Sequence, residues 1–142
     1  MFSSKKQPAI RSLIGEGTVI QGTLGFSGGL RIDGEVQGDV VADAGSTSIL
    51  VISEKARVTG TVKAGHVIIN GAVVGPIESS VLLELQPKAH IQGDVVYEAL
   101  EMHQGATIEG ALHPLSKGAR ADAVTTDDKP ALKLLATGSD KN

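Results

Sequence analysis

The sequence has no cysteine, which excludes disulfide scaffolds, thiol catalysis and zinc sites built on cysteine. Aromatic residues are scarce, because only Phe2, Phe26 and Tyr97 occur in 142 residues. A core must therefore be built from valine, isoleucine, leucine and alanine. The longest aliphatic run, residues 49–52, is far shorter than the roughly 20 residues of a membrane-spanning helix.

Motifs that carry enzyme chemistry are also missing. There is no G-x-x-x-x-G-K-[S/T] phosphate-binding loop, no G-x-S-x-G and no H-E-x-x-H. The histidines His66, His90, His103 and His113 are irregularly spaced, which argues against a metal cluster. We therefore expect no catalytic, metal or cofactor site and no bound nucleotide. Residues 1–6 have no apolar segment of the kind found in a secretory signal peptide, so we expect a cytoplasmic protein.

Charge is distributed unevenly along the chain. Residues 1–11 carry Lys5, Lys6 and Arg11 without any acid, whereas residues 12–112 carry five basic and twelve acidic side chains. Phosphate backbones would repel this acidic body, and it has few aromatic rings on which bases could stack, so nucleic-acid binding is not expected. The basic N-terminal arm instead suits an anionic membrane surface.

Glycines mark an internal repeat. Sixteen of the 18 glycines lie between Gly15 and Gly110, and six follow β-branched or polar residues and precede a short apolar strand. These six are Gly22, Gly38, Gly60, Gly75, Gly93 and Gly110, spaced by 16, 22, 15, 18 and 17 residues. Around each glycine, apolar and polar residues alternate with period two, as in Val58–Val62, which predicts strands with one buried face and a bend at the glycine.

Each repeat also contains a second short apolar strand. We predict these strands at residues 30–32, 50–52, 67–69, 81–83 and 100–102. Short strands joined by bends about every 18 residues indicate a parallel β-helix of about six rungs. A β-sandwich would use Asp-Gly or Asn-Gly hairpins. Asp33-Gly34 and Asn70-Gly71 occur, but their matching positions within the repeat favour rung corners over hairpins.

The ends of the chain differ from this repeat. We predict a flexible basic membrane-targeting arm at residues 1–12, a β-helix domain at 13–113 and a disordered tail at 114–142. The 22-residue spacing predicts that residues 43–48 bulge from a rung corner. No polar capping unit flanks the repeat, so the first and last rungs should each be adhesive. The predicted polymerisation interface comprises Val19, Leu24, Ile108 and Leu112.

The repeat resembles the bactofilins, a family of bacterial cytoskeletal proteins. The resemblance covers about residues 1–112 and rests on GLRIDGEVQGDV (29–40), VIINGAVVGPI (67–77), AHIQGDVVYEALEMHQGATIEGAL (89–112) and the opening MFSSKK (1–6). It implies a right-handed β-helix that polymerises end to end without nucleotide, head to head and tail to tail, into non-polar filaments. It also implies filaments on the inner face of the cytoplasmic membrane that scaffold cell-wall proteins and shape the cell. The family's membrane peptide would correspond to Met1, Phe2, Lys5 and Lys6.

Two other functions remain open at this stage. Left-handed β-helix acyltransferases also have 18-residue rungs, built from hexapeptides, and Ile14, Ile20, Phe26 and Ile32 lie six residues apart. That register fails at Gly38, but such an enzyme would use His66 or His90 as its general base. The other alternative is a capped monomeric binding module.

Overall fold

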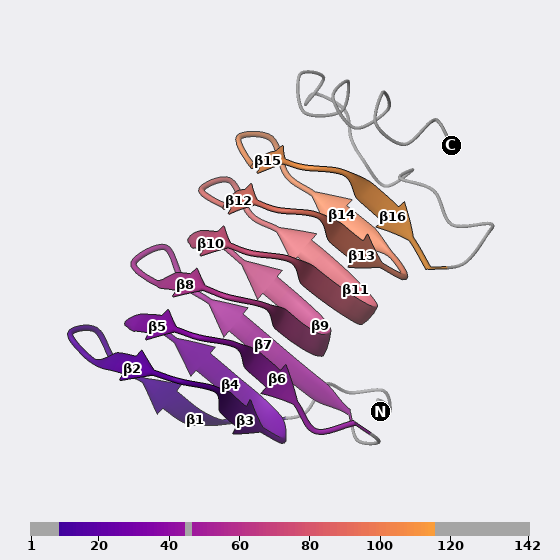
Figure 1. Cartoon of the computed structure of the whole chain (residues 1–142). Helices are drawn as coiled ribbons and strands as arrows, with labels where there is room; N and C mark the ends of the chain where they lie inside the picture. The colour runs from indigo at the N-terminus through magenta and orange to yellow at the C-terminus, as the bar shows by residue number, and fades with distance from the viewer. Residues whose placement is uncertain (1–8, 45–46, 116–142) are drawn as a thin grey trace.

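The computed structural model describes residues 9–44 and 47–115, and within these ranges the secondary structure consists of strands (Figure 1). Three short strands form each turn of a parallel β-solenoid of about six turns, or rungs. The rungs comprise residues 10–26, 28–42, 48–64, 66–79, 82–97 and 100–114. The predicted parallel β-helix is therefore confirmed, and the sandwich is excluded because every strand pair is parallel. The right-handed sense of the coil stays a prediction.

Three faces run along the solenoid. Face A is formed by β1 (Ile10–Ile14), β4 (Gly28–Ile32), β7 (Ser48–Ile52), the second halves of β9 (Val62–Ile69) and β11 (Ile77–Leu85), and β14 (Leu100–Met102). Face B is formed by β2 (Val19–Gln21), β5 (Glu35–Gln37), β8 (Arg57–Thr59), β10 (Ala72–Val74), β12 (His90–Gln92) and β15 (Thr107–Glu109). Face C is formed by β3 (Leu24–Phe26), β6 (Val40–Ala42), the first halves of β9 and β11, β13 (Val95–Tyr97) and β16 (Leu112–Pro114).

The core lies inside the coil and consists of columns of equivalent side chains. Because parallel pairing aligns each rung with the next, apolar side chains stack at one residue per rung. One such column on face B comprises Val36, Val58, Val73, Ile91 and Ile108, all buried. A second on face A comprises Ile32, Ile52, Ile69, Leu85 and Met102. As predicted, Val58 and Val62 point inward.

The corner between faces B and C explains the repeated glycines. Five of the six have a positive φ, for example +151° at Gly60, which L side chains rarely adopt. Each glycine after the first also lies directly against the carbonyl group of the glycine in the preceding rung, so that a Cβ atom would collide with it. Glycine is therefore required at this corner for close stacking as well as for bending.

The corner between faces A and B contains the two glycine turns that were predicted from the sequence. Asp33-Gly34 and Asn70-Gly71 form two-residue corners in rungs 2 and 4, as predicted. Longer corners occupy the other rungs. Ion pairs join the longer corners across the short ones. Lys55 Nζ in rung 3 lies 3.8 Å from Glu16 Oε2 in rung 1, and Lys88 Nζ in rung 5 lies 3.3 Å from Glu54 Oε1 in rung 3.

The corner between faces C and A varies in length. A single residue, Gly65, separates the two halves of β9, whereas residues 43–47 separate β6 from β7. The extra residues of the 22-residue repeat therefore lie at a rung corner, and Ser48 itself belongs to β7. Ser48 and Ser79 are buried under this corner, where Ser48 Oγ accepts from the Gly65 N–H at 2.9 Å and Ser79 Oγ donates to the Gly65 carbonyl at 2.8 Å.

One strand register was predicted wrongly. Residues 81–83 were predicted to be the second strand of their repeat, as residues 67–69 are of theirs, and they do lie within β11. The structure pairs Val67 with Leu83 and Ile69 with Leu85, two residues further along the chain. Val81 instead lies at the corner and is 55% exposed. Two residues, Ser80 and Val81, occupy this corner in β11, whereas Gly65 alone occupies it in β9. The strand that follows the corner in β11 therefore begins later than the sequence pattern suggested.

Candidate assembly interface

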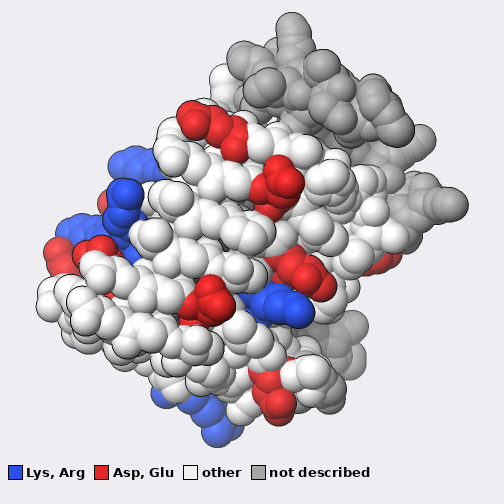
Figure 2. Space-filling model, in the orientation of Figure 1, with Lys and Arg blue, Asp and Glu red and all other residues white. Residues whose placement is uncertain are grey.

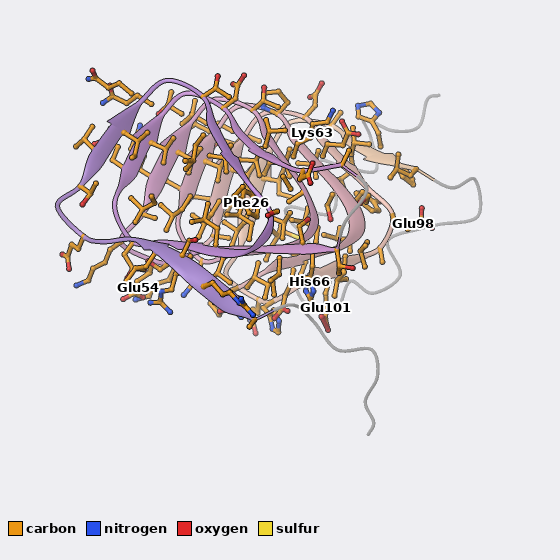
Figure 3. All side chains as sticks on the ribbon, turned by 90° about the horizontal axis from the view of Figure 1, so that it is seen from below. Phe26, Glu54, Lys63, His66, Glu98 and Glu101 are labelled. Atoms are coloured by element: carbon orange, nitrogen blue, oxygen red, sulfur yellow. The ribbon has the colours of Figure 1, made fainter. Side chains whose placement is uncertain are left out.

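The first rung presents apolar side chains at the N-terminal end of the coil. Its inward residues Ile14, Ile20, Leu24 and Phe26 are only half-buried, whereas equivalent residues in the middle rungs are fully buried. Leu24 was a predicted interface residue and lies at this end. Figure 3, seen from below Figure 1, shows Phe26 pointing into the coil.

Val19, the other predicted residue of the first rung, points outward on face B. It is 51% exposed and lies opposite Glu35 in the next rung, while its neighbour Ile20 points inward. Sequence reasoning therefore missed Ile20 and Phe26 as residues of the open end. Their signal was the six-residue spacing of Ile14, Ile20 and Phe26, which places one inward side chain on each face.

The inward side chains of the last rung are buried, unlike those of the first rung. Ile108 and Leu112, the predicted interface residues of this end, lie in β15 and β16 with exposed fractions of only 2% and 4%. Both side chains belong to the core columns. Their part in polymerisation stays a prediction, and substituting either would disturb the core as well as the end.

The backbone N–H and C=O groups of the first and last rungs pair with a neighbouring rung on one side only within the described residues. At the glycine corner, each rung donates two N–H groups to the next rung, as in Gly22 N to Gln37 O at 3.0 Å and Leu24 N to Asp39 O at 2.8 Å. The last such pair is donated by Gly93 and Val95. Within residues 9–44 and 47–115, no further rung accepts from Gly110 and Leu112. The terminal strands are thus edge strands, a known template for pairing with another chain.

Ionisable side chains lie mainly on the outside of the coil. Figure 2 shows acidic and basic groups interspersed over one face of the molecule. A hydrogen bond from the Ser53 side chain, opposed by partial burial and helped by Arg31, lowers the pKa of Asp33 below its ordinary value of 3.8. The Arg31 Nε–Asp33 Oδ1 distance is 2.9 Å.

The histidines lie on different parts of the surface. His90 on face B is exposed, with Nδ1 2.8 Å from Thr107 Oγ1 and Nε2 3.9 Å from Glu109 Oε2. His66 lies on face A on the same side as Glu101 (Figure 3), and burial lowers its pKa below 6.5 against the opposing effect of Glu84 and Glu101. The two candidate general bases of the acyltransferase alternative are therefore not brought together.

The part of the chain that the structure describes contains neither a metal-ligand cluster nor a membrane-spanning helix. In residues 9–44 and 47–115, no three His, Asp or Glu side chains are arranged to hold a metal ion. None of the secondary structure in this part of the chain is a helix that could cross a membrane. The predicted membrane-binding residues Met1, Phe2, Lys5 and Lys6 lie outside the described residues. The boundaries predicted for the arm and tail stay predictions, although β1 already begins at Ile10.

Comparison with known families decides the identity of the coil. A family model for bactofilins, described as polymer-forming cytoskeletal, matches residues 12–113. The chain belongs to the bactofilin family. The matched region extends from β1 to β16, so the bactofilin domain and the solenoid coincide almost completely. Comparisons with curated proteins and with solved structures found no match for this bactofilin.

Proposed function

We propose that this bactofilin is a non-enzymatic scaffold that assembles end to end, without nucleotide, into non-polar filaments. The observation that carries the proposal is that the strands of the first and last rungs pair on one side only within the described residues. Joining two ends would pair these backbone groups and bury apolar side chains. Strand pairing and burial supply the driving force, so hydrolysis of a nucleotide is not needed.

Electron microscopy of the purified full chain tests this proposal. Filaments should form in buffer treated with apyrase, which removes nucleoside triphosphates, and added ATP or GTP should not change their number or length. Particles that stay monomeric in light scattering at high protein concentration would instead support the capped binding module. Filaments that require a nucleotide would also contradict the proposal.

We further propose that the filaments lie on the inner face of the cytoplasmic membrane, anchored by the arm at residues 1–12. Met1 and Phe2 could each contribute about 1.5–3 kcal/mol when buried in lipid. Lys5 and Lys6 would each add about 1 kcal/mol near an anionic surface. One arm is thus a weak anchor, but the many arms of a filament would act together.

Sedimentation with anionic liposomes tests the anchor. The full chain should pellet with the vesicles, and a variant lacking residues 2–7 should stay in the supernatant. A variant lacking residues 137–142 removes the same number of residues from the other end and should pellet normally. Equal pelleting of all three proteins would rule out the arm as the anchor.

The scaffold would recruit proteins of cell-wall synthesis or remodelling and so shape the cell. Support comes from the family's cytoskeletal character and from the regular surface that stacked rungs present. Deletion in the native host should change cell shape and displace new wall synthesis. Unaltered shape and wall labelling would contradict this role.

A further inference from the structure

We infer that residues 129–136, near the C-terminus, dock in a groove on the side of the coil of their own chain. The groove lies at the corner between faces C and A, away from both ends, so the inference goes beyond the proposed assembly and does not depend on it. It follows from an exposed apolar side chain in the groove, from the charge of the groove and of residues 129–136, and from the place where the described chain ends.

Apolar side chains form much of the groove. It has a volume of about 530 Å³ and lies beside the longest of the corners between faces C and A, with Val41, Ala64 and Val81 in its lining. Val81 is 55% exposed, although it lies in the middle of the coil. The other large apolar side chains that are exposed in residues 9–44 and 47–115 belong to the first rung or to the C-terminal end. An exposed apolar group inside a groove marks a surface that another segment covers.

The charged side chains of the groove favour a basic occupant. Asp43 and Glu78 line it together with one base, Lys63. Lys63 Nζ lies 3.8 Å from Glu78 Oε1, so this base already has an acidic partner. The lining therefore carries one more negative than positive charge. A segment that combines apolar and positively charged side chains would complement it.

Residues 129–136 have this composition. Their sequence, KPALKLLA, contains three leucines and two lysines and no acidic side chain. Contact of the leucines with Val41 and Val81 would remove apolar surface from water on both sides. The lysines would lie near Asp43 and Glu78, and this pairing would fix the position of the segment in the groove.

The described chain ends at the same corner of the coil. Leu115 follows β16 on face C in rung 6, and its N–H donates to the Tyr97 carbonyl at 2.6 Å. Rungs are about 4.8 Å apart, so the groove in rungs 2 to 4 lies roughly 10–20 Å from Leu115 along the coil. Residues 116–128 join Leu115 to the segment and can span about 40 Å when extended, which is enough to reach the groove.

Because the chain has no cysteine, a pair of introduced cysteines provides a specific test. Ser80 lines the groove and is exposed, so Ser80→Cys with Ala136→Cys leaves the valines and leucines of the contact in place. Oxidation of this full chain with diamide should give an intramolecular disulfide, seen on a denaturing gel as a faster-migrating monomer. Thr59→Cys with Ala136→Cys is the matched control, because Thr59 is also exposed in the middle of the coil but lies on face B.

The groove pair should form its disulfide at least about tenfold faster than the control pair, because docking raises the effective concentration of the two thiols. Adding Val81→Lys to the groove pair should lower its rate to that of the control, and circular dichroism checks that the coil is still folded. Equal rates for the two pairs, or a rate unchanged by Val81→Lys, would overturn the inference.

Two further combinations test which segment occupies the groove. Chains carrying only Ser80→Cys, mixed with chains carrying only Ala136→Cys, should form linked dimers no faster than the control pair. Fast formation of such dimers would assign the groove to the segment of a neighbouring copy and overturn docking within one chain. Ser80→Cys with Phe2→Cys should also react slowly. A faster reaction than with Ala136→Cys would assign the groove to the N-terminal arm instead. Filament formation is scored separately in every case, so failure of this inference leaves the proposed function standing.

Discussion

At the scale of single residues, the glycine column at the corner between faces B and C is the most restrictive feature of the solenoid. Every member after Gly22 contacts the carbonyl of the glycine below it, so that no side chain can be added without moving two rungs apart. The same residues give the repeat its periodicity in the sequence. The periodicity could therefore be recognised from the sequence because a backbone contact requires it.

Substituting one column glycine should destabilise the coil strongly. Gly60→Ala places a Cβ against the Gly38 carbonyl at a φ of +151°, and we expect a loss of at least about 2 kcal/mol in the free energy of unfolding. Gly25→Ala is the control, because its nearest neighbour would be the Val41 carbonyl at 3.9 Å, and it should change stability by about 0.5 kcal/mol or less. Urea unfolding measures both. Equal losses would contradict the role of the column.

The carboxyl group of Asp33 should make stability depend on pH. Its folded pKa lies below 3.8, so its stabilising effect is complete above that value and is lost as the pH falls through the lower folded pKa. Asp33→Asn should therefore cost up to about 1 kcal/mol at neutral pH. Urea unfolding of variant and wild type should differ less in strong acid. A difference that grows on acidification would contradict the assignment.

At the scale of the strand, the β11 register depends on the length of one corner. Leu83 and Leu85 are fully buried, whereas Val81 is mostly exposed. Sequence periodicity alone could not place these residues, because the three consecutive apolar residues Val81, Leu82 and Leu83 fit the alternating pattern in more than one register. The corner between faces C and A accommodates one residue in β9 and two in β11, and nothing local in the sequence distinguishes the two cases.

Truncating two residues of β11 should verify this register. Leu83→Ala leaves a cavity in the core column and should cost about 2–5 kcal/mol, while Val81→Ala should cost about 0.5 kcal/mol or less. Thermal unfolding of the two variants measures the contrast. Similar losses would restore the register first predicted from the sequence.

At the scale of the whole molecule, the sequence predicted the architecture better than the ends. Repeats reveal the coil because every rung repeats the same inward positions, as Val58 and Ile91 do. The exposure of a terminal residue depends on what lies beyond the last paired strand, and periodicity carries no information about that. Ile20 and Ile108 occupy the same position of the repeat, yet Ile20 in the first rung is half-buried and Ile108 in the last rung is fully buried.

Assembly should make thermal stability depend on protein concentration. Because joined ends exist only between folded chains, polymerisation stabilises the folded state by mass action. The melting temperature of the full chain should rise with each tenfold increase in concentration, and Val19→Lys should reduce the slope. Differential scanning calorimetry at several concentrations measures this. A melting temperature independent of concentration would show that the folded unit is a single chain.

The corner between faces C and A already tolerates lengths from the one residue of Gly65 to the five of residues 43–47, while the strands on either side keep their pairing. Loops that vary in this way tolerate insertions, because lengthening a surface loop costs little entropy. A peptide tag or small domain grafted beside Glu98 would therefore be displayed at regular intervals along a fibre. The same corner would offer microscopists a labelling position remote from the column of glycines.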